Sequence, residues 1–294
     1  MKEWVVKTDQ IRLDKFLYEK EPSLTYGLLC KYLKSNKIKV DGKKQPLSHR
    51  LSIGNCVRLY ADIGNAAKLC VVYEDEQLLV ANKPAGLPVC GQEDSDSLLR
   101  RAQIYLQSSG AVPLLCHRLD TGTSGLVLIA KTAQAQEFLT DLIRKRAICK
   151  KYLCVTFGHP FPESATLRDY LVKNAEKGTV RVFSSPRPNA KEIVTQYETL
   201  AVSGRLALLE VTLVTGRTHQ IRAHMASIGC PLLGDSKYGN QEINRELKLK
   251  YQALCAYSLA FPEIPQGPFS EWSNKKWVLD KPWYAKQVLD HTLK

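Results

Sequence analysis

The chain has 294 residues, of which 44% are hydrophobic, so it is long enough for one large domain and a small one, each with its own core. It carries 42 Lys and Arg against 29 Asp and Glu, and such an excess of positive charge favours a polyanionic partner. A basic protein of membrane surfaces would need an amphipathic helix with a broad apolar face, which we do not find, and no apolar stretch has the length of a membrane span.

The cysteines favour a reducing compartment. There are nine of them, an odd number, and no C-x-x-C pair or short disulfide framework is visible. The segment Met1–Lys7 also lacks the apolar core of a signal peptide. We therefore expect a soluble cytoplasmic protein that has no membrane partner.

Residues 1–65 form a candidate small domain, with 13 Lys and Arg against 7 Asp and Glu. The spacing predicts a helix over 11–17, a helix over 26–35 that carries Lys31 and Lys34, a strand over 38–40, a hairpin turn at Asp41-Gly42 and a strand over 53–60. By composition, residues 63–67 are a linker to a second domain.

The rest of the chain alternates strands and helices. The patterns predict strands over 71–73, 78–82, 126–130, 150–158, 195–200, 206–214 and 256–261, and helices over 97–108, 132–146 and 218–228, the last two with Thr132 and Thr218 as N-caps. We expect residues 159–190, with four prolines and several basic residues, to form loops that contact nucleic acid, and the segment after Pro265 to lie at the periphery.

One stretch, Leu114–Ala130, combines charge and glycine with a buried strand. His117, Arg118 and Asp120 precede a T-G-T-S-G loop, and an apolar run follows directly. Glycines allow close backbone approaches that a Cβ would forbid. The stretch is therefore either a rigid site beside a core strand or a solvated surface turn.

Three common chemistries fail on spacing. His219 and His224 are five residues apart, and no Glu follows the first, so they do not form the H-E-x-x-H zinc motif. Ser124 does not lie in a G-x-S-x-G nucleophile elbow. The sequence H-R-L-D has one residue more than the H-R-D of kinases, and no glycine-rich phosphate loop accompanies it.

Longer motifs carry a resemblance to a known family. The chain reads H-R-L-D-T-G-T-S-G at 117–125, K-x-Y at 150–152, G-R-T-H-Q-I-R-A-H at 216–224 and G-x-P-L-L-G-D at 229–235. Over roughly residues 70–260 it resembles the RluA family of RNA pseudouridine synthases. The segments R-L-D-K-F-L at 12–17, I-K-V-D-G-K at 38–43 and I-G-N-C-V-R-L at 53–59 resemble an S-four-like RNA-binding domain.

The resemblance implies an α+β fold. It places a catalytic domain over residues 66–280 on a mixed, mainly antiparallel sheet, after a small α+β RNA-binding domain over 1–65 and before a tail over 281–294. The implied activity is conversion of specific uridines to pseudouridine in structured RNA, with ribosomal RNA as the first candidate. A tRNA substrate and a catalytically silent RNA-binding or ribosome-assembly factor are the alternatives.

The resemblance also assigns roles to residues. It implies that Asp120 is the catalytic carboxylate, that Tyr152 lies against the target base and that Arg222 pairs with the carboxylate. Other RNA contacts are expected at Arg118, which fills the space of a flipped nucleotide, and at His117, Arg217, His219, Lys83, Lys31 and Lys34. Whether Asp120 attacks as a nucleophile or removes a ribose proton stays open. Because the isomerisation involves no net redox change or hydrolysis, we expect no metal and no cofactor, and we expect a monomer.

Overall fold

The computed structural model describes residues 1–21, 24, 26–60, 68–91 and 96–293. The chain divides into two compact units, one formed by Met1–Cys70 with Leu87–Leu114 and the other by Val71–Gly86 with Leu115–Lys294. The expected linker at 63–67, and with it the expected domain boundary, lies outside the described residues.

The first unit contains two small antiparallel sheets and three α-helices within its described ranges. Its elements are β1 (Lys2–Val5), β2 (Ile11–Arg12), α1 (Leu13–Lys20), α2 (Tyr26–Lys34), β3 (Ile38–Val40), β4 (Arg50–Leu51), β5 (Cys56–Leu59), α4 (Leu98–Leu106) and the 3-10 turn η1 (Gln107–Ser109). The sheets have the orders β1-β5-β3 and β2-β4. Apolar side chains of α1, α2 and β3, including Leu17, Leu29 and Ile38, form a buried core. Both helices and both strands that the sequence predicts before residue 60 are confirmed.

The second unit is built on a large sheet. Its elements are β6 (Val71–Glu74), β7 (Leu78–Lys83), β9 (Ser124–Ala130), α5 (Ala133–Arg144), β10 (Cys149–Phe157), β11 (Ser164–Asn174), β12 (Thr179–Phe183), β13 (Lys191–Ser203), β14 (Leu206–Leu213), α6 (Gln220–Ser227), α7 (Gln241–Glu246), β15 (Leu254–Ala260), η2 (Ser270–Trp272), β16 (Lys276–Val278) and α8 (Trp283–Leu289), and the short β8 (Leu114–Leu115) precedes β9. Thr132 caps α5 as predicted, because its hydroxyl accepts a hydrogen bond from the Ala135 N–H.

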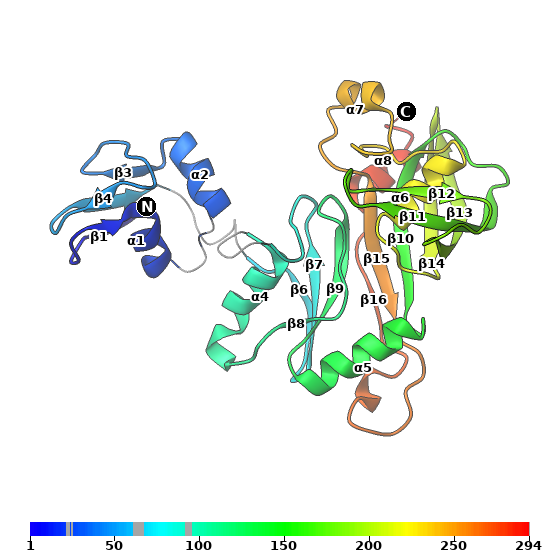
Figure 1. The fold of residues 1–294 in the computed structure, drawn as a ribbon, viewed down its shortest axis with the longest axis horizontal. Coiled ribbons are helices and arrows are strands. Elements are labelled where there is room, and N and C mark those ends of the chain that lie inside the picture. The colour runs from blue at the N-terminus through cyan, green and yellow to red at the C-terminus, as the bar shows by residue number, and fades with distance from the viewer. Residues whose placement is uncertain (22–23, 25, 61–67, 92–95, 294) are drawn as a thin grey trace. The chain divides into compact units, whose positions relative to one another are not determined.

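The strands follow the order β12-β11-β13-β14-β10-β15-β9-β7-β6, and β16 pairs with β15 beside this path. Within this order only β15 and β9 run parallel, and the other neighbours are antiparallel. The predicted α+β class with a mixed, mainly antiparallel sheet is therefore confirmed. In Figure 1, β15 lies between β9 and β10, so one late strand joins two earlier parts of the sheet.

The expectation of loops over residues 159–190 is wrong. Strands β11 and β12 form an antiparallel hairpin there, and the prolines lie outside both strands. The inner face of the hairpin buries Leu171 and Val180 against Ile193 and Ala223. Basic residues on its exposed face hid the alternating pattern that marks a half-buried strand.

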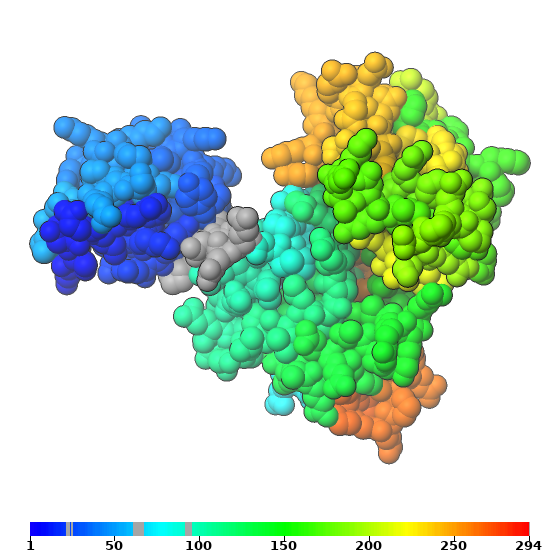
Figure 2. Space-filling view, in the orientation of Figure 1, coloured from blue at the N-terminus to red at the C-terminus, as the bar shows by residue number. Residues whose placement is uncertain are grey.

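We expected the segment after Pro265 to lie at the periphery, but much of it is packed against the second unit. Trp272 and Trp277 are buried, and α8 buries Tyr284 and Val288 in a cluster with residues of β10 and β14. Phe269 stacks on Phe138 of α5 with ring centroids 4.5 Å apart, and Figure 2 shows the orange segment after β15 against the green α5 segment. Large aromatic side chains bury enough surface to attach a segment that has little regular structure.

None of the helices that the structure describes combines the length and apolar character needed to cross a membrane.

Candidate active site

The loop that carries Asp120 is fixed from several directions. The Thr123 N–H donates to the Asp120 carbonyl at 3.0 Å, and the Thr123 hydroxyl accepts a hydrogen bond from Gln252 Nε2 at 3.0 Å. The Thr121 carbonyl accepts from the Gly86 N–H at 2.7 Å and from Lys83 Nζ at 3.2 Å. These contacts hold the backbone on both sides of the carboxylate, as a site that presents a reactive group requires.

Two glycines let this loop approach the rest of the sheet. A Cβ on Gly122 would lie 2.2 Å from Gln252 Oε1, and a Cβ on Gly125 would lie 2.3 Å from the Ala256 carbonyl oxygen. Gly125 also has φ +115°, which side chains disfavour. The close approaches expected from the T-G-T-S-G loop are therefore present.

Strand β15 brings Tyr152 to the Asp120 loop. Its residue Ala256 pairs with Tyr152 of β10 on one side and with Gly125 of β9 on the other. The side chain of Tyr152 is 6% exposed and borders the same cavity as Asp120. Burial, reinforced by the negative charge of Asp120, raises the pKa of Tyr152, so the phenol stays protonated.

Arg222 joins two carboxylates from distant segments. Its Nη1 donates to Asp120 Oδ2 at 2.8 Å, while Nε and Nη2 donate to the two oxygens of Asp235 at 2.7 and 2.8 Å. Burial opposes the charge of this 5% exposed side chain, but the hydrogen bonds and charge of Asp235, and then those of Asp120, raise the pKa of Arg222 above its ordinary value. Arg222 is therefore a permanent cation between the two carboxylates.

The two carboxylates differ in solvent exposure and in the number of hydrogen bonds that they accept. Asp235 is inaccessible to solvent, and its Oδ1 also accepts the N–H groups of Lys237 and Tyr238. Within the described part of the chain, Asp120 Oδ1 has no hydrogen-bond partner, because both Arg222 Nη1 and the nearby His219 Nε2, at 3.8 Å, face Oδ2. One oxygen of Asp120 is thus free to contact a substrate.

The helix that carries Arg222 begins one residue later than predicted. Thr218 is not its N-cap; His219 takes that position with φ 54° in the left-handed region, and its side chain caps no backbone N–H. Gln220 stabilises the turn instead, because its Oε1 accepts from the Arg217 N–H and the Thr215 hydroxyl.

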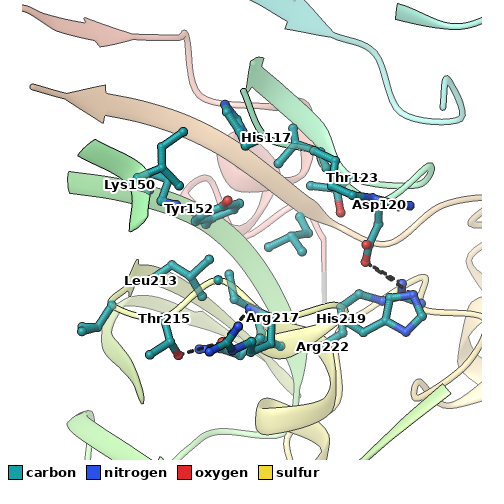
Figure 3. A pocket seen from close by; sticks show the side chains of 18 of the residues that line it. His117, Asp120, Thr123, Lys150, Tyr152, Leu213, Thr215, Arg217, His219 and Arg222 are labelled. Carbon is teal, nitrogen blue, oxygen red and sulfur yellow. Dashed lines mark hydrogen bonds and ion pairs between the residues drawn. The ribbon is translucent and has the colours of Figure 1, made fainter. Parts of the chain in front are cut away.

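A cavity of about 450 Å³ surrounds these groups, within the size range of small-molecule sites. Figure 3 shows Tyr152 and Lys150 on one wall, Asp120 opposite them, and Arg217, His219 and Arg222 along a third side. Asp120 is the single carboxylate of the lining, whereas six side chains are Lys or Arg, namely Arg118, Arg144, Arg146, Lys150, Arg217 and Arg222. A lining of this kind fits a polyanionic ligand.

Sequence reasoning missed several of these residues. Lys150 precedes Tyr152 by two residues, so the alternation along a strand places both on one face and was a usable signal. Arg144 and Arg146 fall at the end of the predicted helix over 132–146, and no local pattern there indicates a cavity. Asp235 ends the G-x-P-L-L-G-D motif, for which the sequence predicts no role.

Two residues that we expected to contact RNA, Lys83 and His117, instead make hydrogen bonds within the protein. Lys83 is fully buried and donates to the Pro84 and Thr121 carbonyls, and burial lowers its pKa to about 8, so its ammonium group does not reach a phosphate. His117 borders the cavity, but its Nε2 accepts the Leu128 N–H at 3.0 Å, and burial lowers its pKa to about 3. A neutral ring engaged with the backbone offers RNA no positive charge.

The structure brings Asp120, Tyr152, Arg222, Arg118, Arg217 and His219 to one cavity. Lys31 and Lys34 belong to the first unit, where both are exposed on α2. Across the described residues, no cluster of three or more His, Cys, Asp or Glu side chains is arranged to hold a metal ion.

The chain is similar to known proteins over most of its length. Residues 77–227 match the family described as RNA pseudouridylate synthase. The chain is 35% identical to the ribosomal large subunit pseudouridine synthase C of Rickettsia felis, over 86% of this chain and 88% of that protein, and 35% identical to the protein of the same name in Rickettsia conorii, over 90% and 93%. The solved structure of human RNA pseudouridylate synthase domain containing 4 superimposes with a TM-score of 0.60 at 26% identity, over 76% of this chain and 92% of that one. The chain therefore belongs to the RluA family of RNA pseudouridine synthases, isomerases that convert uridine to pseudouridine.

Proposed function

We propose that this pseudouridine synthase modifies the RNA of the large ribosomal subunit and that Asp120 is its catalytic carboxylate. The names of the two Rickettsia relatives support the substrate. The geometry of the cavity supports the residue. The observation that carries the assignment is the ion pair of Arg222 with Asp120 Oδ2, which leaves Oδ1 without a hydrogen-bond partner among the described residues.

The reaction breaks the N1–C1′ bond of uridine, rotates the uracil and forms a C5–C1′ bond. It needs an ionised carboxylate at the ribose, either to attack C1′ or to remove a ribose proton. A buried anion is tolerated when it is paired, and Arg222 supplies the charge at 2.8 Å. Both routes use the free oxygen of Asp120, so the arrangement serves either.

Tyr152 provides a flat apolar face for the uracil. Because burial keeps its phenol protonated, its hydroxyl is a hydrogen-bond donor rather than a base in the resting site. The base must leave its stack to reach this position, which costs a few kcal/mol. Arg118 is exposed at the edge of the cavity, where its guanidinium group can stack in the vacated space.

Residues 1–65 complete the proposal as an S-four-like RNA-binding domain. Its exposed Lys31 and Lys34 both lie in the last turn of α2 and can contact phosphates. The described cysteines are all free thiols, which supports a cytoplasmic enzyme. We also propose that it acts as a monomer. Because the isomerisation has no redox or hydrolytic step, we propose that it needs no metal or cofactor.

Tritium release from transcripts labelled at uridine C5 tests the function. The full-length protein should release tritium from large-subunit ribosomal RNA, and Asp120→Asn should lower the rate by at least about 10³-fold while it remains folded. Asp290→Asn, an exposed carboxylate of the C-terminal segment, is the matched control. Release from tRNA alone would refute the substrate, and a fully active Asp120→Asn would refute the residue.

A further inference from the structure

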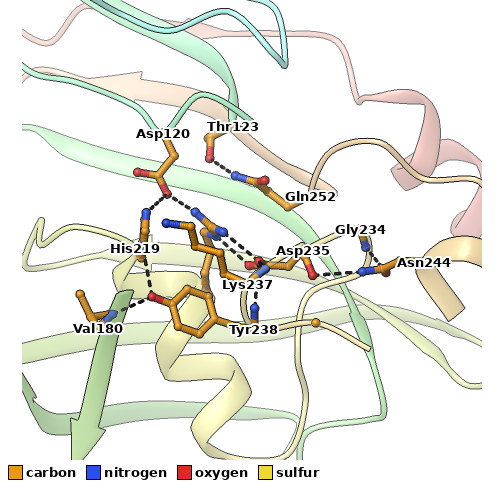
Figure 4. Close-up of polar contacts among 12 residues, drawn as sticks. Asp120, Thr123, Val180, His219, Gly234, Asp235, Lys237, Tyr238, Asn244 and Gln252 are labelled. Atoms are coloured by element: carbon orange, nitrogen blue, oxygen red, sulfur yellow. Dashed lines mark hydrogen bonds and ion pairs between the residues drawn. The ribbon is translucent and has the colours of Figure 1, made fainter. Parts of the chain in front are cut away.

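Tyr238 lies behind the cavity and contacts both groups that face Asp120. Its ring centroid is 5.3 Å from the Arg222 guanidinium carbon, and its hydroxyl oxygen is 2.9 Å from His219 Nδ1. The same hydroxyl accepts a hydrogen bond at 2.8 Å from the N–H of Val180, the second residue of β12. Figure 4 shows this arrangement, with the ring of His219 between the tyrosine and Asp120. The ion pair of Asp120 with Arg222 does not involve the Tyr238 hydroxyl.

The two hydrogen-bond partners of the Tyr238 hydroxyl favour one tautomer of His219. The Val180 N–H is a donor only, so the hydroxyl of Tyr238 accepts that bond and keeps its own hydrogen. Within the described ranges, the single other partner of the hydroxyl is His219 Nδ1. A phenol oxygen can also accept a second bond, from a protonated Nδ1, but the hydroxyl hydrogen then has no acceptor among the described residues. Both groups are satisfied when the hydroxyl donates to Nδ1, an arrangement that places the proton of a neutral imidazole on Nε2.

The Nε2–H group faces the carboxylate. Nε2 is 3.8 Å from Asp120 Oδ2, slightly beyond hydrogen-bond length, as resting catalytic contacts often are. The charged groups that act on His219 are Asp120 and Asp235, which favour its cation, and Arg222 and Lys237, which oppose it. Burial adds the largest effect and lowers the pKa of His219, so the ring is neutral at physiological pH.

We propose that Tyr238 is a positioning residue for the isomerase reaction, because its hydroxyl fixes the His219 tautomer that directs Nε2–H at Asp120. This role rests on the proposed function of Asp120. Its effect is to direct a second N–H group, in addition to Arg222 Nη1, toward Oδ2, so that both groups favour the same oxygen and Oδ1 stays available. The other tautomer would set the lone pair of Nε2 against the carboxylate.

The ring of Tyr238 adds a second constraint. The ring lies against the guanidinium of Arg222, so Tyr238 contacts both side chains whose N–H groups face Asp120, Arg222 and His219. The bond from Val180 ties Tyr238 to the β11–β12 hairpin, whose turn is also held by a hydrogen bond from Lys237 Nζ to the Gly178 carbonyl. Tyr238→Phe keeps the ring beside Arg222 and removes the hydroxyl with both of its hydrogen bonds, to His219 and to Val180, so a second comparison is needed to separate them.

The first test is ¹⁵N NMR of full-length protein labelled at histidine, without RNA. In the wild type His219 should have a protonated Nε2 and an unprotonated Nδ1, with its resonances assigned by their loss in His219→Gln. Tyr238→Phe should give a mixture of tautomers. Tyr197→Phe is the matched control, because the Tyr197 hydroxyl also bonds to a backbone group, the Pro162 carbonyl, and should leave the tautomer unchanged. A wild-type His219 protonated on Nδ1, or a tautomer unaffected by Tyr238→Phe, would overturn the proposal.

The second test is a double-mutant cycle on tritium release. Tyr238→Phe should lower kcat about tenfold and leave KM unchanged, as the loss of one oriented hydrogen bond implies. His219→Gln keeps an N–H donor near the position of Nε2 and no longer depends on the tyrosine, so adding Tyr238→Phe to it should cost less than about twofold.

An equal loss in both backgrounds would show that the hydroxyl acts only on the fold through Val180, and would overturn the proposal. The two tests also separate this inference from the proposed function. If no RNA is turned over by any variant, the proposed function fails, while the NMR result on the free protein still decides whether Tyr238 sets the tautomer.

Discussion

Two loops supply a carboxylate to the same guanidinium, and they use it differently. In the loop after α6, Asp235 accepts four hydrogen bonds and is inaccessible to solvent. In the loop before β9, the Asp120 side chain is 19% exposed, and one of its oxygens has no partner among the described residues. Pairing with Arg222 is common to both, so pairing alone does not identify a reactive group.

The difference separates a structural from a chemical role. A carboxylate that accepts four hydrogen bonds and is inaccessible to solvent fixes its neighbours and presents no oxygen to a substrate. A carboxylate that is paired on one side only keeps its charge and an accessible oxygen. The same contrast should be visible in the stability and the activity of variants.

The largest expected effect on stability belongs to Asp235. Asp235→Asn leaves the buried Arg222 cation without its main counter-ion and can turn an amide NH2 toward the N–H groups of Lys237 and Tyr238. It should therefore lower the free energy of unfolding by about 3–5 kcal/mol. Asp120→Asn should lower it by less than about 1 kcal/mol, because that side chain meets solvent and accepts one strong hydrogen bond. Urea unfolding followed by circular dichroism measures both values.

The comparison would break down if Asp120→Asn destabilised the protein as much as Asp235→Asn does. It would be sharpened by the activity data, since Asp120→Asn should abolish turnover in a protein that melts like the wild type.

An intermediate effect is expected at His117, in the same loop as Asp120. Its folded pKa of about 3 lies below the ordinary 6.5, so between these values the unfolded chain binds a proton that the folded chain does not. The stability contributed by His117 is therefore complete above about pH 6.5 and is lost as the pH falls toward 3. Between pH 7 and pH 5 this loss amounts to about 2 kcal/mol.

His117→Gln is the matched variant, because its side-chain oxygen can still accept the Leu128 N–H but does not titrate. Unfolding free energies of both proteins at the two pH values give the difference directly. Parallel pH dependences in wild type and His117→Gln would contradict the role assigned to the buried ring.

The smallest effect is expected where the charges are fully solvated. Replacing Lys31 and Lys34 together by Gln should weaken RNA binding several-fold and lower the slope of log K against log salt by about 1–2, since each phosphate contact contributes roughly 0.7–0.9. Filter binding at several salt concentrations measures the slope. The control is Lys281→Gln with Lys286→Gln, which removes the same charge from exposed positions near the C-terminus and should leave the slope unchanged.

Much of the fold and part of the site follow from local signals. Hydrophobic periodicity located most helices and strands, and the motif around Gly122 and Gly125 identified the loop that carries Asp120. Asp235 and Tyr238 escaped because their partners lie 13 to 58 residues away, where no local pattern records the contact. Lys83 was misjudged for the opposite reason, since a lysine is ordinarily exposed and only the packed structure shows this one to be buried.

The N-cap of α6 shows the same limit in one residue. Local preference favours Thr218, yet the hydrogen bond between His219 and Tyr238 fixes a left-handed residue at the next position. Tertiary contacts therefore override capping preference at the point where the site needs a ring directed at Asp120.

The position of β15 has a consequence for synthesis of the enzyme. Asp120 and Tyr152 precede by more than a hundred residues the residue that aligns their segments, Ala256. Until β15 has emerged from the ribosome, β9, which follows the Asp120 loop, and β10, which carries Tyr152, have no strand between them. The alignment of Asp120 with Tyr152 therefore depends on a strand that is synthesised after both of them.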